Sequence, residues 1–240
     1  MKLIFGFRKN NPDFQSIFLI TISFLGLFFL LILYLWAPQT RLYYSFQKTA
    51  ILSIFIIICL VGILAATYPS TCKTLMKFQE DSEKTTKNSN IQFEGHHPDC
   101  GKFTSHTLYI KGNKYCPGCL GLSIGAFITI IGTVIYYFHG FPPSYGEISF
   151  WMGLCMVFLT LFLIVFFSLG KTFKFILNMA LVMGSFLILV GVDIVTANWV
   201  IELYFLVLIM LWILTRMMIS ESSHKRICKD CLNGSTCVYK

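Results

Sequence analysis

The sequence predicts an all-α membrane protein with about six transmembrane helices and a small cytoplasmic module rich in cysteine and histidine. Of its 240 residues, 56% are hydrophobic and 12% are charged, whereas soluble domains carry about 25% charged residues. Six apolar stretches each approach the ~20 residues that a helix needs to cross a bilayer core. Two polar segments outside these stretches hold most of the cysteines and histidines. This composition excludes a soluble globular protein, a disordered chain, collagen and a secreted disulfide scaffold.

The six predicted spans divide the chain into four parts. Residues 1–68 hold the first two spans, at about 14–36 and 50–68, and residues 69–119 form a cytoplasmic loop. Residues 120–219 hold four more spans, at about 120–138, 150–169, 175–195 and 200–219, and residues 220–240 form a cytoplasmic tail. The first apolar run is too long for a signal peptide, so we interpret it as a retained anchor. Thr196-Ala197-Asn198 must form a tight outer turn between the last two spans.

The basic residues predict the orientation of these spans. If the N-terminus is cytoplasmic, inner segments carry seventeen of the nineteen lysines and arginines, and outer loops carry only Arg41 and Lys48. The positive-inside rule therefore predicts a multi-pass protein of the cell membrane with both termini in the cytoplasm. Five aromatic residues are then expected near the outer interface: Trp36, Tyr136, Tyr137, Trp151 and Trp199. The positive-inside rule also accounts for the net charge of +8, because most basic residues lie in the inner segments. The lipid bilayer is therefore the expected partner, and binding to nucleic acid is not expected.

The cytoplasmic loop contains the ligand pattern His97-x2-Cys100-x15-Cys116-x2-Cys119. This is the spacing of a zinc ribbon with histidine in the first place. A two-residue gap lets a tight turn direct two ligands to one tetrahedral metal. Residues 103–110 alternate like a strand and residues 111–114 can reverse it, which predicts a β-hairpin between the ligand pairs. The alternatives are cysteines that bind no metal and a redox-active pair of Cys116 and Cys119.

The tail repeats this pattern as His224-x3-Cys228-x2-Cys231-x5-Cys237. Clustered cysteines in the reducing cytosol more often bind metal than form disulfides. Two zinc ions are predicted, with one shared site or an iron–sulfur cluster as alternatives; such clusters usually require four cysteines. Each pattern fills all four ligand positions, which is typical of structural rather than catalytic zinc. No residue is therefore assigned a catalytic role.

Charged residues inside a span are costly and suggest function. Asp193 and Glu202 are the two acidic residues in the predicted spans, and both lie near the outer ends of the last two spans. We expect both carboxylates to reach headgroup water beside the turn; the alternative is an outer-face cation site made by this pair.

Four further residues are expected to pack within the bundle or to reach its inner interface. Asn178 should bond a neighbouring helix, and Arg216 should extend to the inner interface. Gly121-x3-Gly125 predicts close helix packing within the bundle, with a dimer face as the alternative.

The stretch HTLYIKGNKYCPGCLGLSIG, residues 106–125, together with His97-Pro98-Asp99-Cys100, resembles a family of uncharacterised small prokaryotic polytopic membrane proteins. In that family a Cys/His loop leads through a C-x-x-C-[TS]-G motif directly into a transmembrane helix. Here Leu120 stands where a small polar residue is usual, and the resemblance covers about 30 residues. It implies a membrane location and metal ligation by these cysteines, and it brings no assigned activity.

These patterns favour a scaffold or docking component over two other functions. Structural zinc sites would rigidify a surface for another membrane or cytosolic protein. A small transporter or channel supported by the zinc module is the first alternative, and a membrane thiol oxidoreductase using Cys116 and Cys119 is the second. An enzyme is the less favoured class, because no nucleophile elbow, P-loop or zinc-protease helix is present.

Overall fold

The computed structural model describes residues 6–7, 14–36, 45–67, 93–94, 97–98, 108–110 and 113–229. The long helices are α1 (Phe14–Trp36), α2 (Ser45–Thr67), α4 (Pro117–His139), α5 (Ser144–Phe166), α6 (Lys171–Thr196) and α7 (Trp199–Lys229). The short strands are β1 (Gly6–Phe7), β2 (Phe93–Glu94), β3 (His97–Pro98), β4 (Leu108–Ile110), β5 (Asn113–Tyr115) and β6 (Phe167–Ser168). The described residues are thus mostly helical, with short strands before α1 and between the helices.

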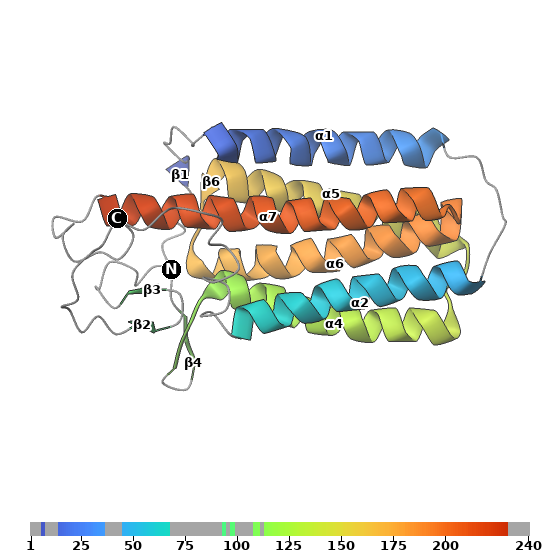
Figure 1. The fold of residues 1–240 in the computed structure, drawn as a ribbon, viewed down its shortest axis with the longest axis horizontal. Helices are drawn as coiled ribbons and strands as arrows, with labels where there is room; N and C mark the ends of the chain where they lie inside the picture. The colour runs from blue at the N-terminus through green and yellow to red at the C-terminus, as the bar shows by residue number, and fades with distance from the viewer. Residues whose placement is uncertain are drawn as a thin grey trace, which may run out of the picture.

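Successive helices run in alternating directions along one bundle (Figure 1). Consequently α1 begins and α7 ends at the same end, which we call the terminal end. The connections between α1 and α2, α4 and α5, and α6 and α7 lie at the opposite end, which we call the far end. The predicted placement of both chain ends on one side follows from this even number of crossings. That this side is the cytoplasm stays a prediction.

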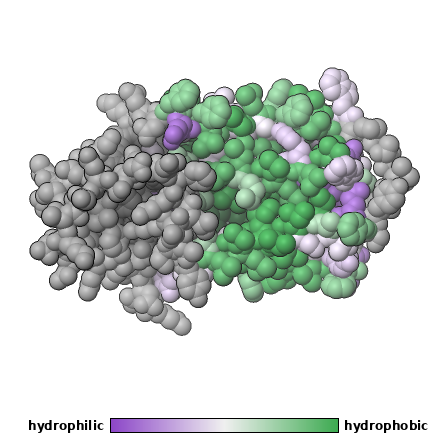
Figure 2. Space-filling model, viewed as in Figure 1, coloured by the Kyte–Doolittle hydropathy of each residue, from purple (hydrophilic) through white to green (hydrophobic). Residues whose placement is uncertain are grey.

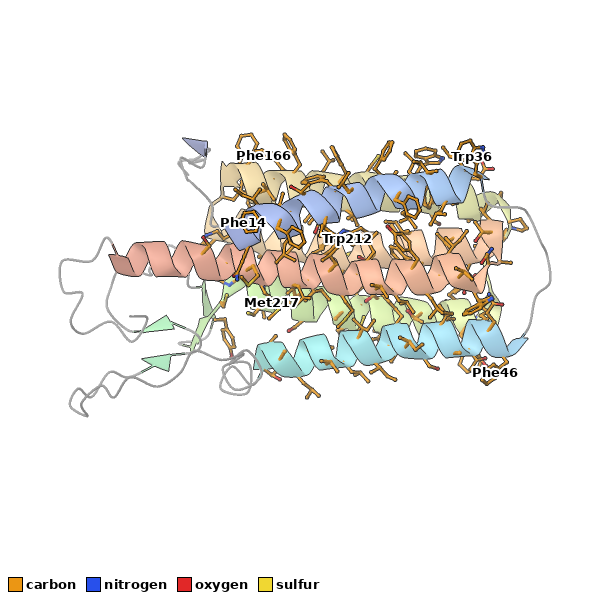
Figure 3. All side chains as sticks on the ribbon, turned by 45° about the horizontal axis from the view of Figure 1, so that its top comes forward. Phe14, Trp36, Phe46, Phe166, Trp212 and Met217 are labelled. Atoms are coloured by element: carbon orange, nitrogen blue, oxygen red, sulfur yellow. The ribbon has the colours of Figure 1, made fainter. Side chains whose placement is uncertain are left out.

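The bundle has the surface of an integral membrane protein. All six helices are long and apolar enough to cross a bilayer, and a broad apolar belt covers the visible face (Figure 2). Large side chains such as Phe28, Phe127 and Val207 are more than 60% exposed. Phe14 is exposed at the terminal end, and Trp36 and Phe46 are exposed at the far end (Figure 3). Such a surface belongs in lipid and makes the chain a multi-pass membrane protein.

The helices agree with the predicted spans and extend beyond most of them. Helix α1 has the predicted bounds, whereas α2, α4 and α5 begin three to six residues before the predicted spans. Helix α7 continues past residue 219 to Lys229. Hydropathy detects the apolar stretch, but a helix also satisfies the backbone groups of the polar turns that follow the bilayer core.

Helix α6 is the most buried helix of the bundle, and α4 and α5 approach it through glycines. Half of the residues in its most apolar stretch are buried, against 22% in α1 and α2. A Cβ added at Gly121 of α4 would lie 2.3 Å from the Phe175 carbonyl oxygen of α6. At Gly125 it would lie 3.0 Å from the Met179 carbonyl oxygen. These contacts confirm that Gly121-x3-Gly125 serves close packing within the bundle.

A second glycine interface, which the sequence analysis missed, joins α5 to α6. A Cβ on Gly153 of α5 would lie 2.6 Å from the Gly184 carbonyl oxygen of α6. A Cβ on Gly191 of α6 would likewise lie 2.8 Å from the Gly146 carbonyl oxygen of α5. The seven-residue spacing of both glycine pairs was the available signal, because it returns to the same helix face after two turns.

Short antiparallel pairs organise the segments at the terminal end. Strands β4 and β5 pair with the register Leu108↔Tyr115 and Ile110↔Asn113, which confirms a hairpin at this place. Its turn is shorter than predicted, because residues 113–114 belong to β5. Strand β2 pairs with β3, and β1 pairs with β6 across the ends of α1 and α5. Within the described ranges these pairs are isolated, and they do not assemble into a zinc ribbon.

Candidate functional site: polar clusters at the two ends of the bundle

A cluster of polar side chains lies inside the bundle at its far end. We call Gln47, Tyr136, Asp193 and Glu202 the far-end acidic cluster. Its members come from the first turn of α2, the last turn of α4, the last turn of α6 and the first turn of α7. Asp193 is 4% exposed and Glu202 is fully buried. Four helices therefore enclose two carboxyl groups inside a membrane-spanning bundle.

Hydrogen-bond donors from neighbouring helices reach both carboxyl groups. The Tyr136 hydroxyl donates to Asp193 Oδ2, and Gln47 Nε2 donates to Glu202 Oε2 at 3.4 Å. The two carboxyl groups are themselves within hydrogen-bonding reach of each other. In the described part of the chain, Glu202 Oε1 has no partner. Lys48 Nζ lies 4.0 Å from the centroid of the Tyr136 ring, so one positive charge stands beside the cluster.

The turn between α6 and α7 brings the two acids together. Ala197 adopts a left-handed conformation with φ 45°, and its N–H donates to the Asp193 carbonyl at 3.2 Å. Asn198 then caps the start of α7, because its side-chain oxygen accepts from the Val200 N–H at 3.0 Å. This C-cap followed at once by an N-cap reverses the chain in two residues. The tight turn predicted at residues 196–198 is confirmed.

Burial of the two acids corrects the expectation that they reach headgroup water. Position along the span suggested access to the interface, but both residues face the bundle interior, where other helices cover them. Tyr136 is likewise buried rather than interfacial, because it turns inward to Asp193. The other four predicted interfacial residues are exposed near the far end: Trp36, Tyr137, Trp151 and Trp199. The structure thus brings Asp193 and Glu202 together, and sequence reasoning missed their donors Gln47 and Tyr136.

At the terminal end, the segment Cys116–Cys119 begins helix α4. Cys116 is the N-cap residue and Pro117 occupies the first turn, where its missing N–H is not needed. Both cysteine side chains are half-buried. Cys116 directly follows Tyr115, the last residue of β5. A hairpin therefore leads straight into a cysteine pair at a helix N-terminus.

Arg216 of α7 packs against this segment. A Cβ added at Gly118 would lie 2.0 Å from Arg216 Nη2, so the guanidinium occupies the space that a side chain would fill. Arg216 Nε donates to Asn178 Oδ1 at 2.6 Å, and Asn178 Nδ2 donates to the Lys174 carbonyl. The prediction that Asn178 bonds a neighbouring helix is confirmed. Arg216 lies near the terminal end as expected, and Asn178 of α6 holds its half-buried side chain.

The remaining predicted metal ligands lie in β3, at the end of α7 or outside the described residues. His97 belongs to β3, and His224 and Cys228 stand one turn apart in the last part of α7. Cys100, Cys231 and Cys237 lie outside the described residues. Among the side chains that the structure describes, no group of three or more histidine, cysteine or acidic residues gathers around a point. The two ligand sets therefore stay predictions.

The comparisons add no relative to this geometry: no protein-family model, no curated protein and no solved structure matches the chain.

Proposed function

We propose that the protein is a scaffold of the cell membrane whose cytoplasmic face is rigidified by structural zinc, so that it can dock another membrane or cytosolic protein. The observation that carries this proposal is the Cys116–Cys119 pair at the start of α4, directly after the β4–β5 hairpin. A metal bound there would fix the loop to the end of a membrane helix.

The first zinc ion would be held by His97, Cys100, Cys116 and Cys119. Strands β2–β3 and β4–β5 form hairpins beside the two ligand pairs, which is how small zinc modules present their ligands. The positive end of α4 and the Arg216 guanidinium both favour the anionic thiolate that metal ligation needs. Four protein ligands leave no open position, so this zinc would be structural.

The second zinc ion would be held by His224, Cys228, Cys231 and Cys237. The i, i+4 spacing of the first two on α7 suits ligation of one metal from one helix turn. Binding would connect the end of α7 to the tail, so that folding of this module would be coupled to metal binding. The two modules together would form the docking surface.

Zinc content tests this proposal directly. Purified full-length protein in mild detergent should hold close to two zinc ions per chain by mass spectrometry. Cys116→Ser should lose about one zinc ion and lower the thermal stability. Cys155→Ser is the matched control, because Cys155 is exposed on the membrane face of α5 and should leave zinc unchanged.

Unchanged zinc content in Cys116→Ser would overturn the proposal. Absence of metal together with a disulfide that forms and is reduced between Cys116 and Cys119 would favour the thiol oxidoreductase. Iron with a broad visible absorption band would instead identify a cluster used in electron transfer.

A second candidate function, cation transport, is favoured by the buried far-end acidic cluster. Ionisable residues inside membrane bundles often mark ion pathways. In that case Asp193→Asn or Glu202→Gln should abolish ion flux into proteoliposomes and leave zinc content unchanged. Flux that persists in both variants would remove the transport candidate.

A further inference from the structure

We propose that Asp193 and Glu202 form a binding site for one exchangeable proton, shared between their carboxyl groups inside the membrane-spanning bundle. The proposal is independent of the zinc modules, which lie at the other end. It rests on the burial of both acids, on their direct approach to each other and on the uneven distribution of donors around them.

The first step concerns charge. Two carboxylates in contact repel each other, and burial removes the water that would screen them. Glu202 is fully buried and lies within hydrogen-bonding reach of Asp193. A pair of carboxyl groups in this arrangement holds one proton, because a protonated acid can then donate to the carboxylate beside it.

The second step concerns the positions of the donors. Asp193 accepts from the Tyr136 hydroxyl, and Glu202 Oε2 accepts from Gln47 at a longer distance of 3.4 Å. Glu202 Oε1 has no partner within the described residues, although it is buried. An unpartnered buried oxygen is costly for a carboxylate and much less so for a neutral acid. The arrangement therefore assigns the negative charge to Asp193 and the proton to Glu202.

The surroundings favour a proton over a metal cation. Neutral donors from Tyr136 and Gln47 already occupy carboxyl oxygens, whereas a metal ion needs several free oxygen ligands. Lys48 of α2, packed on the Tyr136 ring, balances one negative charge but not two. The nearest acid on α5, Glu147, is exposed, and on α1 the buried titratable group is Tyr34. One net negative charge beside one lysine is the balanced state.

Release of this proton would leave two facing carboxylates. The proton would pass to water at the far end, and repulsion would then act between the last turn of α6 and the first turn of α7. The left-handed Ala197 lies between these two turns.

Infrared difference spectroscopy tests the site on the full-length protein in an ester-free detergent. At neutral pH, wild-type protein should show the carbonyl-stretch band of one protonated carboxylic acid, and the band should shift in heavy water. Glu202→Gln should remove the band completely. Glu147→Gln is the matched control, because it makes the same chemical change at an exposed acid of the far end and should leave the band intact.

No band in the wild-type protein, or a band unchanged in Glu202→Gln, would overturn the proposal. If Glu202→Gln does not fold, Gln47→Leu gives an independent result. Loss of the amide donor should shift the frequency of the Glu202 band, and an unshifted band would place the proton on another residue and refute the assignment.

Discussion

Replacement of Gly121 by alanine should push α4 away from α6, the most buried helix of the bundle. The added methyl group would lie 2.3 Å from the Phe175 carbonyl oxygen, whereas ordinary contact begins at 3.4 Å. The backbones must therefore move apart by about 1.1 Å, the difference between these two distances. A carbonyl inside a helix cannot rotate away, since it already accepts a hydrogen bond from its own helix.

The expected cost follows from two opposing terms. Overpacking of a filled interface costs about 1–3 kcal/mol. The higher helix propensity of alanine relative to glycine stabilises the folded protein by up to about 1 kcal/mol. Gly62→Ala in α2 isolates the second term, because nothing lies within 4 Å of a Cβ at that position. Since propensity cancels between the two variants, Gly121→Ala should be less stable than Gly62→Ala by about 1–3 kcal/mol.

Reversible unfolding in mixed micelles of a mild detergent and dodecyl sulfate, followed by circular dichroism, measures this difference. Equal free energies of unfolding for the two variants would refute the reasoning, because they would mean that α4 does not contact α6 through Gly121. A deficit confined to Gly121→Ala would support the glycine-mediated contact.

Three smaller predictions concern single interactions and use the same unfolding measurement. A double-mutant cycle on Ser23 and Thr215, whose hydroxyls are 2.7 Å apart across α1 and α7, should give a coupling of about 0.6 kcal/mol; additive single changes would contradict it. Ala197→Gly should raise the free energy of unfolding by about 0.5–1 kcal/mol. The strain of alanine in the left-handed conformation exceeds the conformational entropy that glycine adds to the unfolded chain. A loss of stability would argue against this backbone conformation. Asn198→Ala should cost about 1 kcal/mol through loss of the cap on the Val200 N–H, and an unchanged stability would show that the cap contributes nothing.

The sequence predicted the number and nature of the helices well, because apolar length is a property of each segment alone. The ends of the helices were predicted less well. Gln47 and Lys48 lie in the first turn of α2, although hydropathy placed them in the preceding loop. The β4–β5 hairpin was predicted from residues 103–114, since alternation and turn chemistry are also local.

The candidate sites were predicted only in part, because their partners come from distant segments. Asp193 and Glu202 were identified as unusual, but the interior position of both depends on which helix faces which. Their donors Gln47 and Tyr136 are 155 and 57 residues away in the chain. The contact of Arg216 with Gly118 has the same origin, and no periodicity within either helix could have predicted it.

Metal content of the full-length protein is the first measurement to make, with Cys116→Ser and Cys155→Ser in parallel. Close to two zinc ions in the wild-type protein, about one in Cys116→Ser and two in Cys155→Ser would support a zinc-rigidified membrane scaffold. A wild-type protein without zinc, or equal zinc content in all three proteins, would contradict it.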